Sequence, residues 1–441
     1  MNASNIIKFD DVPLNKFHIK MTGITFAAHF TDGFSLGVIG IALTAITPQM
    51  GLSPFWQGLI GSSALIGLFL GSLILGWVSD YYGRKKIFMF NFVLIAVATA
   101  LQFFVQTPEQ LFILRIIIGI GLGGDYSVGH TMLAEFLPRK HRGAILGSFS
   151  VIWTFGYVLA SFLGMYLHTT LENSWRWLLV SAFPLALFVL LYRLGSPESP
   201  RWLLRQGRTE EAMAMVKKYL GENVVLDDEQ PEQKTGKFSD LFSRRLITRT
   251  LFNCIFFMCL VIPYFAIYTF LPDILKIMGL AENFTTNMLL NALLILGALL
   301  GIWWTIKFTR RGFLINSFIF LSITLLALGL LPATAKMLMV VTFAAFTLVM
   351  SAVSNLVGVF PAESFPTDVR SSGVGLATAA SRLGAAVGTF LLPMSIANLG
   401  MNYTLLWLTG TLVVGTIVSI AWAPETKTLT LGEASTPDKV G

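Results

Sequence analysis

Residues 115–142 read RIIIGIGLGGDYSVGHTMLAEFLPRKHR. The stretch predicts one long apolar helix that carries Arg115 and Asp125 within it and ends at Glu135, before Pro138 and a basic cluster. An ionisable group at membrane depth costs several kcal/mol, and such groups usually mark a transport pathway or a proton relay. The stretch therefore indicates a membrane helix with functional charges.

The end of this helix recurs in the second half of the chain. The pattern Glu-x-x-Pro-x-x-x-Arg begins at Glu135 and begins again at Glu363. The two copies are separated by about half of the chain. This repeat predicts a protein built from two related halves, as many transporters are.

The composition places the chain in a membrane. Its 441 residues are 54% hydrophobic and 12% charged, with a mean hydropathy of +0.70, whereas a soluble domain is about 25% charged. The net charge of +7 lies in short loops between apolar runs, which indicates membrane topology and not a nucleic-acid partner. The expected partners are the lipid bilayer, protons and a small-molecule substrate, for a chain that acts as a monomer.

Twelve apolar runs approximate the roughly 20 residues that cross about 30 Å of hydrocarbon. In the first half we expect spans at 21–46, 56–78, 87–106, 109–136, 143–168 and 175–194. In the second half we expect spans at 249–276, 285–307, 312–332, 335–360, 371–396 and 402–423. The predicted fold class is an all-α membrane protein with two six-helix pseudo-symmetric bundles.

Lysine and arginine residues set the orientation. With a cytoplasmic N-terminus, the external basic residues are Arg176, Lys276 and Lys336, while Arg115 and Arg382 fall inside spans. The remaining 31 − 2 − 3 = 26 lie on the cytoplasmic side, which is a positive-inside bias. We therefore expect both termini in the cytoplasm and the chain in the inner (plasma) membrane.

One polar segment separates the halves. Within it, 208–221 has the spacing of an amphipathic helix, whereas 225–237 has the composition of a disordered linker. The expected units are an N-terminal bundle at 1–194, a cytoplasmic linker at 195–248, a C-terminal bundle at 249–423 and a cytoplasmic tail at 424–441.

Four motifs follow one another at the predicted cytoplasmic ends of spans. They are Gly76-x-x-x-Asp80-x-x-Gly83-Arg84-Lys85-Lys86, the repeated Glu-x-x-Pro pattern, PESPRWL at 197–203 and Pro424-Glu425-Thr426. With twelve spans and a central linker, this set resembles the major facilitator superfamily, in its branch of sugar porters and metabolite:proton symporters. The resemblance covers nearly the whole chain and implies alternating access, in which two bundles rock about a central site.

The resemblance also implies a gate at the cytoplasmic face. Paired charges there can lock the outward-facing state and separate in the other state. The expected gating residues are Asp80, Gly83, Arg84, Glu135, Arg142, Glu363 and Arg370. The loop at 307–312 lacks the acidic residue of its counterpart, which predicts a less symmetrical lock in the second half. The alternative is that these charges only anchor loops and set topology.

Three charges inside spans are candidates for proton coupling. Asp32 lies about twelve residues into the first span, near the bilayer midplane. The resemblance implies that Asp32 faces Arg115, because proton-coupled sugar porters carry this pair. Asp125 departs from the sugar-porter pattern, so we expect it to be a second protonation site or a substrate ligand. The alternative for the first pair is a static ion pair that fixes helix packing.

The central spans also predict a substrate site. The Gly-Gly-Asp-Tyr stretch at 123–126 resembles symporters of organic acids and nicotinate-type metabolites, and the glutamines that hexose porters carry in the fifth and seventh spans are missing. A carboxylate substrate is therefore preferred, with Arg382 as its ligand because a guanidinium binds a carboxylate through two parallel hydrogen bonds. The expected site residues are His29, Trp153, Tyr157, Tyr264, Tyr268, Asn287, Asn291, Asn355 and Arg382. Each is also a candidate for helix packing.

Several alternatives in function stay open. A sugar or polyol symporter and a proton-driven efflux antiporter fit the same motifs, and a metabolite sensor that does not transport is a distant alternative. An enzyme is not expected, because the sequence has no cofactor loop and no nucleophile–base spacing. An ATP-driven pump is not expected either, since no phosphate-binding G-x-x-x-x-G-K-[ST] loop occurs. We expect no cofactor and no bound metal.

Overall fold

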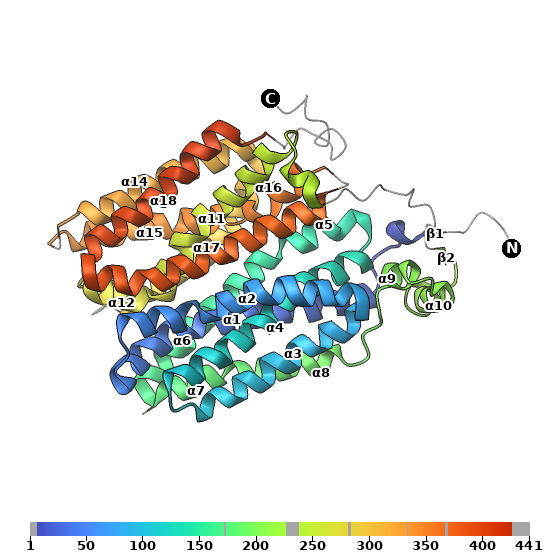
Figure 1. Cartoon of the computed structure of the whole chain (residues 1–441), viewed down its shortest axis with the longest axis horizontal. Helices are drawn as coiled ribbons and strands as arrows, with labels where there is room; N and C mark the ends of the chain where they lie inside the picture. Colours follow the sequence, from blue (N-terminus) through green and yellow to red (C-terminus); the bar gives the residue numbers. More distant parts are fainter. Residues whose placement is uncertain are drawn as a thin grey trace.

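The predicted spans are present as helices. The computed structural model describes residues 7–171, 173–225, 238–280, 284–332, 334–366 and 369–425. Within these ranges, twelve helical segments are long and apolar enough to cross a membrane, which confirms the predicted fold class. Figure 1 shows two bundles lying side by side, one from each half of the chain.

The N-terminal bundle follows the expected spans, with two of them interrupted. The fifth span breaks at Ser148 and the sixth at Ser181. Its helices are α1 (Lys16–Met50), α2 (Pro54–Tyr82), α3 (Arg84–Leu101), α4 (Pro108–Phe136), α5 (Arg139–Gly147), α6 (Phe149–Thr170), α7 (Ser174–Val180) and α8 (Ala182–Arg193). A short 3-10 turn, η3 (Gln102–Phe104), follows α3.

The C-terminal bundle also has two interrupted spans, its first and its fourth. The seventh span breaks at Phe270 and the tenth breaks at Ser354 and Asn355. Its helices are α11 (Ile247–Thr269), α12 (Leu271–Ile277), α13 (Phe284–Lys307), α14 (Arg310–Leu330), α15 (Lys336–Val353), α16 (Leu356–Ser364), α17 (Arg370–Leu399) and α18 (Met401–Trp422). The 3-10 turn η4 (Phe238–Phe242) precedes α11.

The linker forms two short helices, α9 (Pro200–Arg205) and α10 (Thr209–Leu220). They lie at one end of the N-terminal bundle, beside the first described residues of the chain (Figure 1). There a two-residue parallel pairing joins β1 (Ile7–Lys8) to β2 (Val224–Val225), and η2 (Phe9–Asp11) follows β1. The segment expected to be disordered lies outside the described residues from position 226 onward. The positive-inside rule places this end in the cytoplasm, so we call it the cytoplasmic end.

Local sequence explains where several helices begin. Thr107 and Gln110 form a reciprocal capping box at α4, just before Pro108 at the first helical position. Asn15 and His18 form the same arrangement at α1. These caps satisfy backbone N–H groups that have no partner within the helix.

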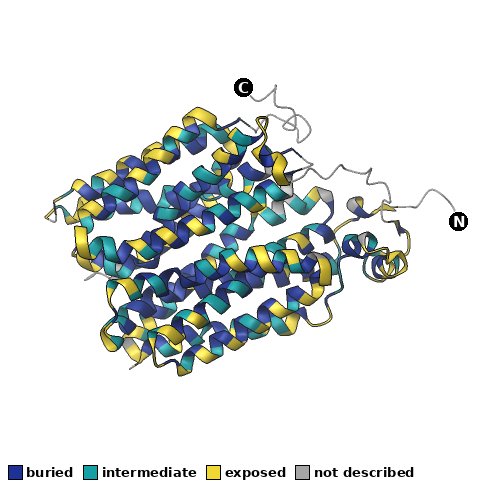
Figure 2. Cartoon of the chain, viewed as in Figure 1, coloured by how far each residue is buried: buried dark blue, intermediate teal, exposed yellow. Residues whose placement is uncertain are grey.

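The outer faces of the bundles are apolar. Large hydrophobic side chains such as Trp77, Leu330 and Ile306 are exposed on helix surfaces. Figure 2 shows buried residues where helices face one another and exposed residues on the outward faces. This is the surface that a lipid bilayer covers.

Glycine permits the closest helix contacts in the N-terminal bundle. A Cβ at Gly119 of α4 would lie 2.2 Å from the carbonyl oxygen of Ala64 in α2, and a Cβ at Gly67 of α2 would lie 2.2 Å from that of Ile116. Between α1 and α6, a Cβ at Gly33 would lie 2.0 Å from the carbonyl oxygen of Trp153. Small residues of this kind let backbones approach in lipid.

The two bundles also touch away from the cytoplasmic end. A Cβ at Gly58, one turn into α2, would lie 2.2 Å from the carbonyl oxygen of Phe390 in α17. A Cβ at Gly40 of α1 would lie 2.4 Å from the carbonyl oxygen of Thr269, the last residue of α11. These backbone contacts close the outer end of the interface between the halves.

The close approach of α2 and α4 predicts the effect of adding one methyl group at Gly119. Gly119→Ala is expected to lower the free energy of unfolding by about 1–3 kcal/mol, because α2 and α4 must move apart. The measurement is the Tm of the purified protein in detergent. Gly410→Ala is the matched control, since no atom lies within 4 Å of a Cβ at that helical position. Equal Tm values for the two variants would contradict the packing role of Gly119.

Candidate functional site

Two aspartates from different helices meet inside the N-terminal bundle. Asp32 of α1 and Asp125 of α4 are both fully buried. One carboxylate oxygen from each and a ring nitrogen of His29 all lie within 4.8 Å of one another. We call these three residues, with Arg193, the buried charge cluster.

Arg193 is the ion-pair partner of Asp125. Its Nη2 lies 2.7 Å from Asp125 Oδ1, and neither side chain is exposed. Its Nη1 donates to the carbonyl oxygen of Phe88 at 2.6 Å, while the guanidinium stacks 3.5 Å from the Phe88 ring centroid and 4.2 Å from that of Phe92. Arg193 was predicted to be cytoplasmic, and this prediction is wrong because its side chain is buried beside Asp125. The only signal was a basic residue at the very end of an apolar run, and such residues normally flank a span.

Arg115 and Asp32 do not form the pair that the resemblance implied. Arg115 is buried and its Nη2 donates to the carbonyl oxygen of Ser35 at 3.3 Å, whereas both carboxylate oxygens of Asp32 have no hydrogen-bond partner. The two side chains start from different depths in the bundle. Asp32 lies beside Asp125 of α4, whereas Arg115 precedes Asp125 by ten residues on α4, which is about 15 Å along the helix axis.

The buried charge cluster has donor atoms that suit a metal ion, namely one imidazole and two carboxylates. The guanidinium of Arg193 already neutralises the carboxylate of Asp125. A metal ion would have to displace this buried cation, so we assign no metal to the cluster.

Arg382 links the buried charge cluster to the C-terminal bundle. Its guanidinium carbon lies 5.1 Å from the ring centroid of Tyr126 in α4 and 5.9 Å from that of Phe265 in α11. Its Nε is buried and has no hydrogen-bond partner. Tyr126 and Phe265 were not predicted as site residues, although Tyr126 follows Asp125 directly.

Aromatic side chains continue from Phe265 across the interface. The Trp153 ring centroid lies 6.2 Å from that of Phe265, 6.4 Å from that of Tyr264, and stacks on Tyr157 at 5.5 Å. Trp153 Nε1 is buried without a hydrogen-bond partner. The structure therefore gathers Trp153, Tyr157, Tyr264 and Arg382 around shared aromatic neighbours.

The hydroxyl groups of Tyr157 and Tyr268 form hydrogen bonds with protein atoms. Tyr157 donates to the carbonyl oxygen of Tyr268 at 2.7 Å, which joins the two halves. Tyr268 donates in turn to Thr347 Oγ1 at 2.9 Å. These hydroxyls stabilise helix contacts in this conformation.

The three asparagines expected at the substrate site make helix contacts as well. Asn291 Nδ2 donates to Asn287 Oδ1 at 2.6 Å, within the first turns of α13. Asn355 Nδ2 donates to the carbonyl oxygen of Ala298 at 3.0 Å, and its Oδ1 accepts from Ser150 of α6 at 2.7 Å. Asn355 therefore joins the two halves through its side chain.

The residues predicted to gate form a charged cluster at the cytoplasmic end of the N-terminal bundle, and we call this cluster the gate. Arg84 Nη1 lies 2.5 Å from Glu135 Oε1, and Ser199 Oγ donates to the other oxygen of Glu135. Glu198 accepts from the backbone N–H groups of Arg84 and Lys85 at the start of α3, where the helix dipole favours an acid. The side chain of Asp80 lies outside the described residues.

Two other gating candidates have backbone roles. Gly83 adopts a φ of 103°, and a Cβ there would lie 2.7 Å from Glu198 Oε2, so only glycine fits. Arg142 donates to the carbonyl oxygen of Leu137 from Nη2 at 2.8 Å. Both residues shape the turns around the gate.

The second half repeats this gate more closely than its loop sequence suggested. Arg310 Nε lies 3.5 Å from Glu363 Oε2. Glu425 accepts from the backbone N–H groups of Arg310 and Arg311 at 3.0 and 3.1 Å, as Glu198 does in the first half. The expected asymmetry is therefore smaller than predicted, because Glu425 comes from the tail and not from the loop. The side chain of Arg370 lies outside the described residues.

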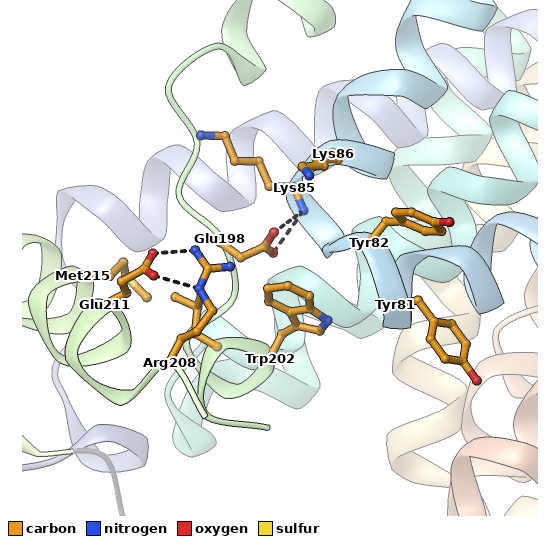
Figure 3. A pocket seen from close by; sticks show the side chains of 10 residues that line it. Tyr81, Tyr82, Lys85, Lys86, Glu198, Trp202, Arg208, Glu211 and Met215 are labelled. Carbon is orange, nitrogen blue, oxygen red and sulfur yellow. Dashed lines mark hydrogen bonds and ion pairs between the residues drawn. The ribbon is translucent and has the colours of Figure 1, made fainter. Parts of the chain in front are cut away.

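A cavity of about 540 Å³ adjoins the first gate (Figure 3). Glu198, Lys85 and Trp202 line it together with Arg208, which donates two hydrogen bonds to the Glu211 carboxylate and so lowers the pKa of Glu211. None of its lining residues belongs to the buried charge cluster. We therefore do not place the substrate there.

Comparisons with known proteins give a consistent result. Residues 21–436 match the family described as Sugar (and other) transporter. The inner membrane metabolite transport protein YgcS of Escherichia coli (strain K12) is 56% identical, over 98% of this chain and 96% of that protein. The arabinose-proton symporter of Bacillus subtilis (strain 168) is 28% identical, with 91% and 90% covered. The niacin transporter NiaP of Acinetobacter baylyi (strain ATCC 33305 / BD413 / ADP1) is 24% identical, with 97% and 98% covered.

The fold has a counterpart among solved structures. The xylose transporter XylE from E. coli, in a partially occluded inward open conformation, matches with a TM-score of 0.78 at 19% identity. The match covers 94% of this chain and 100% of that one. It supports the arrangement of two six-helix bundles.

The buried ion pair predicts a large loss on removing one partner. Arg193→Gln is expected to cost about 3–5 kcal/mol, because it leaves Asp125 buried without a counter-charge. Adding Asp125→Asn should restore part of the loss, and Tm measurements on the four proteins of this cycle give the coupling. Arg208→Gln, which breaks the exposed Arg208–Glu211 pair, is the control and should leave the Tm unchanged. Additive effects of the two buried substitutions would contradict a coupled pair.

Proposed function

The chain belongs to the sugar (and other) transporter family, and we propose that it is a proton-coupled symporter of a small organic metabolite, preferentially a carboxylate. The chain is a metabolite transporter of the inner membrane and not an enzyme. The observation that carries the proposal is that the carboxylate of Asp32 is fully buried and has no hydrogen-bond partner.

Charge balance supports proton binding at Asp32. The one guanidinium that pairs within the buried charge cluster, that of Arg193, is used by Asp125. An ionised carboxylate that has neither a hydrogen-bond donor nor an ion-pair partner is strongly disfavoured in a dry interior, whereas a protonated carboxyl group is not. Asp32 therefore holds a proton in this conformation and ionises when the bundles open it to water.

Arg115 is a cation that can attract Asp32 once Asp32 is ionised. It binds the backbone of α1 at Ser35, one helical turn from Asp32. Loss of the proton from Asp32 creates a negative charge on the helix that this cation already binds, about 4.5 Å along α1 from Ser35. A movement of α1 against α4 that brings the two charges together would then be favoured, which links protonation to helix movement.

The surroundings of Arg382 favour a carboxylate substrate. The guanidinium stands between two aromatic rings, and its Nε has no hydrogen-bond partner. Aromatic walls with few available polar groups suit a small planar molecule. A sugar needs many side-chain partners, yet the hydroxyls of Tyr157 and Tyr268 and the amide of Asn355 bind protein atoms. The similarity to a niacin transporter agrees with this preference.

A sugar or polyol is the second candidate substrate class. Its support is the 28% identity to an arabinose-proton symporter, which exceeds the 24% identity to the niacin transporter. Proton-driven uptake by proteoliposomes separates the two classes, with nicotinate, benzoate, arabinose and inositol as probes. Uptake of the carboxylates alone supports the first class, and uptake of the neutral probes alone overturns it.

Asp32→Asn tests proton coupling. The variant should lose accumulation driven by a proton gradient while keeping counterflow exchange of the same compound, because an amide cannot release a proton. Asp11→Asn, at an exposed position, is the matched control and should behave as the unchanged protein. Gradient-driven accumulation that survives Asp32→Asn would remove Asp32 from the coupling role.

Arg382→Lys tests the carboxylate ligand. The variant should raise the half-saturating concentration of a transported carboxylate by at least about tenfold, since lysine keeps the charge but not the planar fork. Counterflow at varied substrate concentration measures this change. Arg176→Lys, at the outer end of α7, should leave the value unchanged. An unaltered affinity in Arg382→Lys would make Arg382 a structural residue.

A further inference from the structure

Two histidines lie next to the paired aspartates. His29 precedes Asp32 by three residues on α1, which runs away from the cytoplasmic end, and His130 follows Asp125 by five residues on α4, which runs towards it. Each histidine is therefore displaced from its aspartate in the cytoplasmic direction, by about 4.5 and 7.5 Å along the helix axis. Their rings stack with centroids 4.4 Å apart and an interplanar angle of 29°.

His29 presents a proton acceptor to the aspartates. Its Nδ1 lies 3.1 Å from the carbonyl oxygen of Thr25, which can only accept, so Nδ1 carries the hydrogen. Its Nε2 is then the acceptor of the neutral ring, and it is buried without a hydrogen-bond partner. A ring nitrogen of His29 lies within 4.8 Å of carboxylate oxygens of Asp32 and Asp125.

Accessibility rises along this series towards the cytoplasm. Asp32 is fully buried and His29 is 1% exposed, whereas the side chain of His130 is partly exposed. The Nε2 atom of His130 is itself buried and also has no hydrogen-bond partner, although the residue as a whole is partly exposed. Two stacked histidines that each leave a buried ring nitrogen without a partner are unexpected if they only pack, because buried polar atoms are normally satisfied.

We propose that His29 and His130 carry the proton from Asp32 towards the cytoplasm; this rests on the proton coupling at Asp32 proposed above. Protonated Asp32 gives its proton to His29 Nε2, which leaves an aspartate and an imidazolium whose Nδ1–H still donates to Thr25. His29 then releases the Nε2 proton through one water molecule to His130 Nε2. His130 releases it to cytoplasmic water, so both rings end neutral and one proton has moved.

The neighbouring groups suit a transient imidazolium. The carboxylates of Asp32 on the same helix and Asp125 on α4 attract a charge on His29. Arg193 on α8 opposes a charge on His29, and Arg382 on α17 opposes one on His130. Tyr126 contacts both rings edge-on, at 5.3 Å for His29 and 5.6 Å for His130.

The stacked arrangement limits the histidines to one extra proton. Phe149 stacks on His29 at 4.2 Å and on His130 at 4.5 Å, and an aromatic face stabilises a cation. Two imidazolium rings 4.4 Å apart would repel each other at short range. The histidines therefore pass single protons and do not store them. This role replaces the substrate contact expected for His29 from its sequence position.

The first test measures the histidines directly and needs no substrate. The full chain, labelled with ¹⁵N-histidine and held in lipid nanodiscs, contains five histidines whose ring signals report protonation by NMR. His29→Gln and His130→Gln assign the two signals. Asp32→Asn should shift the pH titration of both His29 and His130 but not that of His168, which is exposed at the end of α6. Titrations of His29 and His130 that ignore Asp32→Asn would overturn the relay.

The second test uses transport of whichever probe among nicotinate, benzoate, arabinose and inositol the unchanged protein accumulates. His29→Gln and His130→Gln should slow gradient-driven uptake by about 10²-fold, the usual contribution of a proton-transferring side chain, and keep counterflow, which also shows that they fold. His168→Gln should change neither rate. Full gradient-driven uptake in both variants would overturn the relay while leaving the symporter intact. If no probe shows proton-dependent uptake, the proposed function fails and the NMR result alone decides on the relay.

Discussion

The buried ion pair between Arg193 and Asp125 determines how charge is distributed at the centre of this transporter. A guanidinium enclosed by helices in a bilayer needs a fixed counter-charge, and Asp125 supplies it at 2.7 Å. The same contact removes Asp125 from the set of free acids. Asp32, less than 5 Å from it, is then the carboxylate that has no counter-charge of its own. In the mechanism that we propose, this static pair leaves Asp32 as the group that takes up the proton.

This arrangement depends on how closely the helices approach. Asp32 and Asp125 are on different helices, α1 and α4, and glycines let α1 pack closely on α6 and α4 pack closely on α2. In lipid, such contacts are held by packing and not by the exclusion of water. The dense interfaces also make the bundle a rigid body, which suits a mechanism in which halves rock about a central site.

The interface between the halves is built differently from the interiors of the bundles. It contains aromatic rings, the Arg382 guanidinium and a few polar bonds such as Ser150 to Asn355. At the cytoplasmic end, each half carries its own charged cluster, with Glu198 or Glu425 at a helix start and an arginine–glutamate pair beside it. The Arg84–Glu135 pair is buried, whereas the Arg310–Glu363 pair is half-buried.

The amino-acid sequence by itself determined the membrane class, the twelve spans and the depth of the charges, because hydrophobic length and position along one helix are local properties. It also placed Glu135, Arg84 and Glu363 at the cytoplasmic ends of helices, since motifs at span ends are local as well. Only the tertiary structure decided which charges meet. From the sequence, Arg193 was predicted to lie in the cytoplasm, Arg115 to pair with Asp32, and Asn355 to bind substrate. The contacts that these side chains make depend on which helix lies opposite and at what depth. That choice is made by packing of whole helices, and no single stretch of sequence contains it.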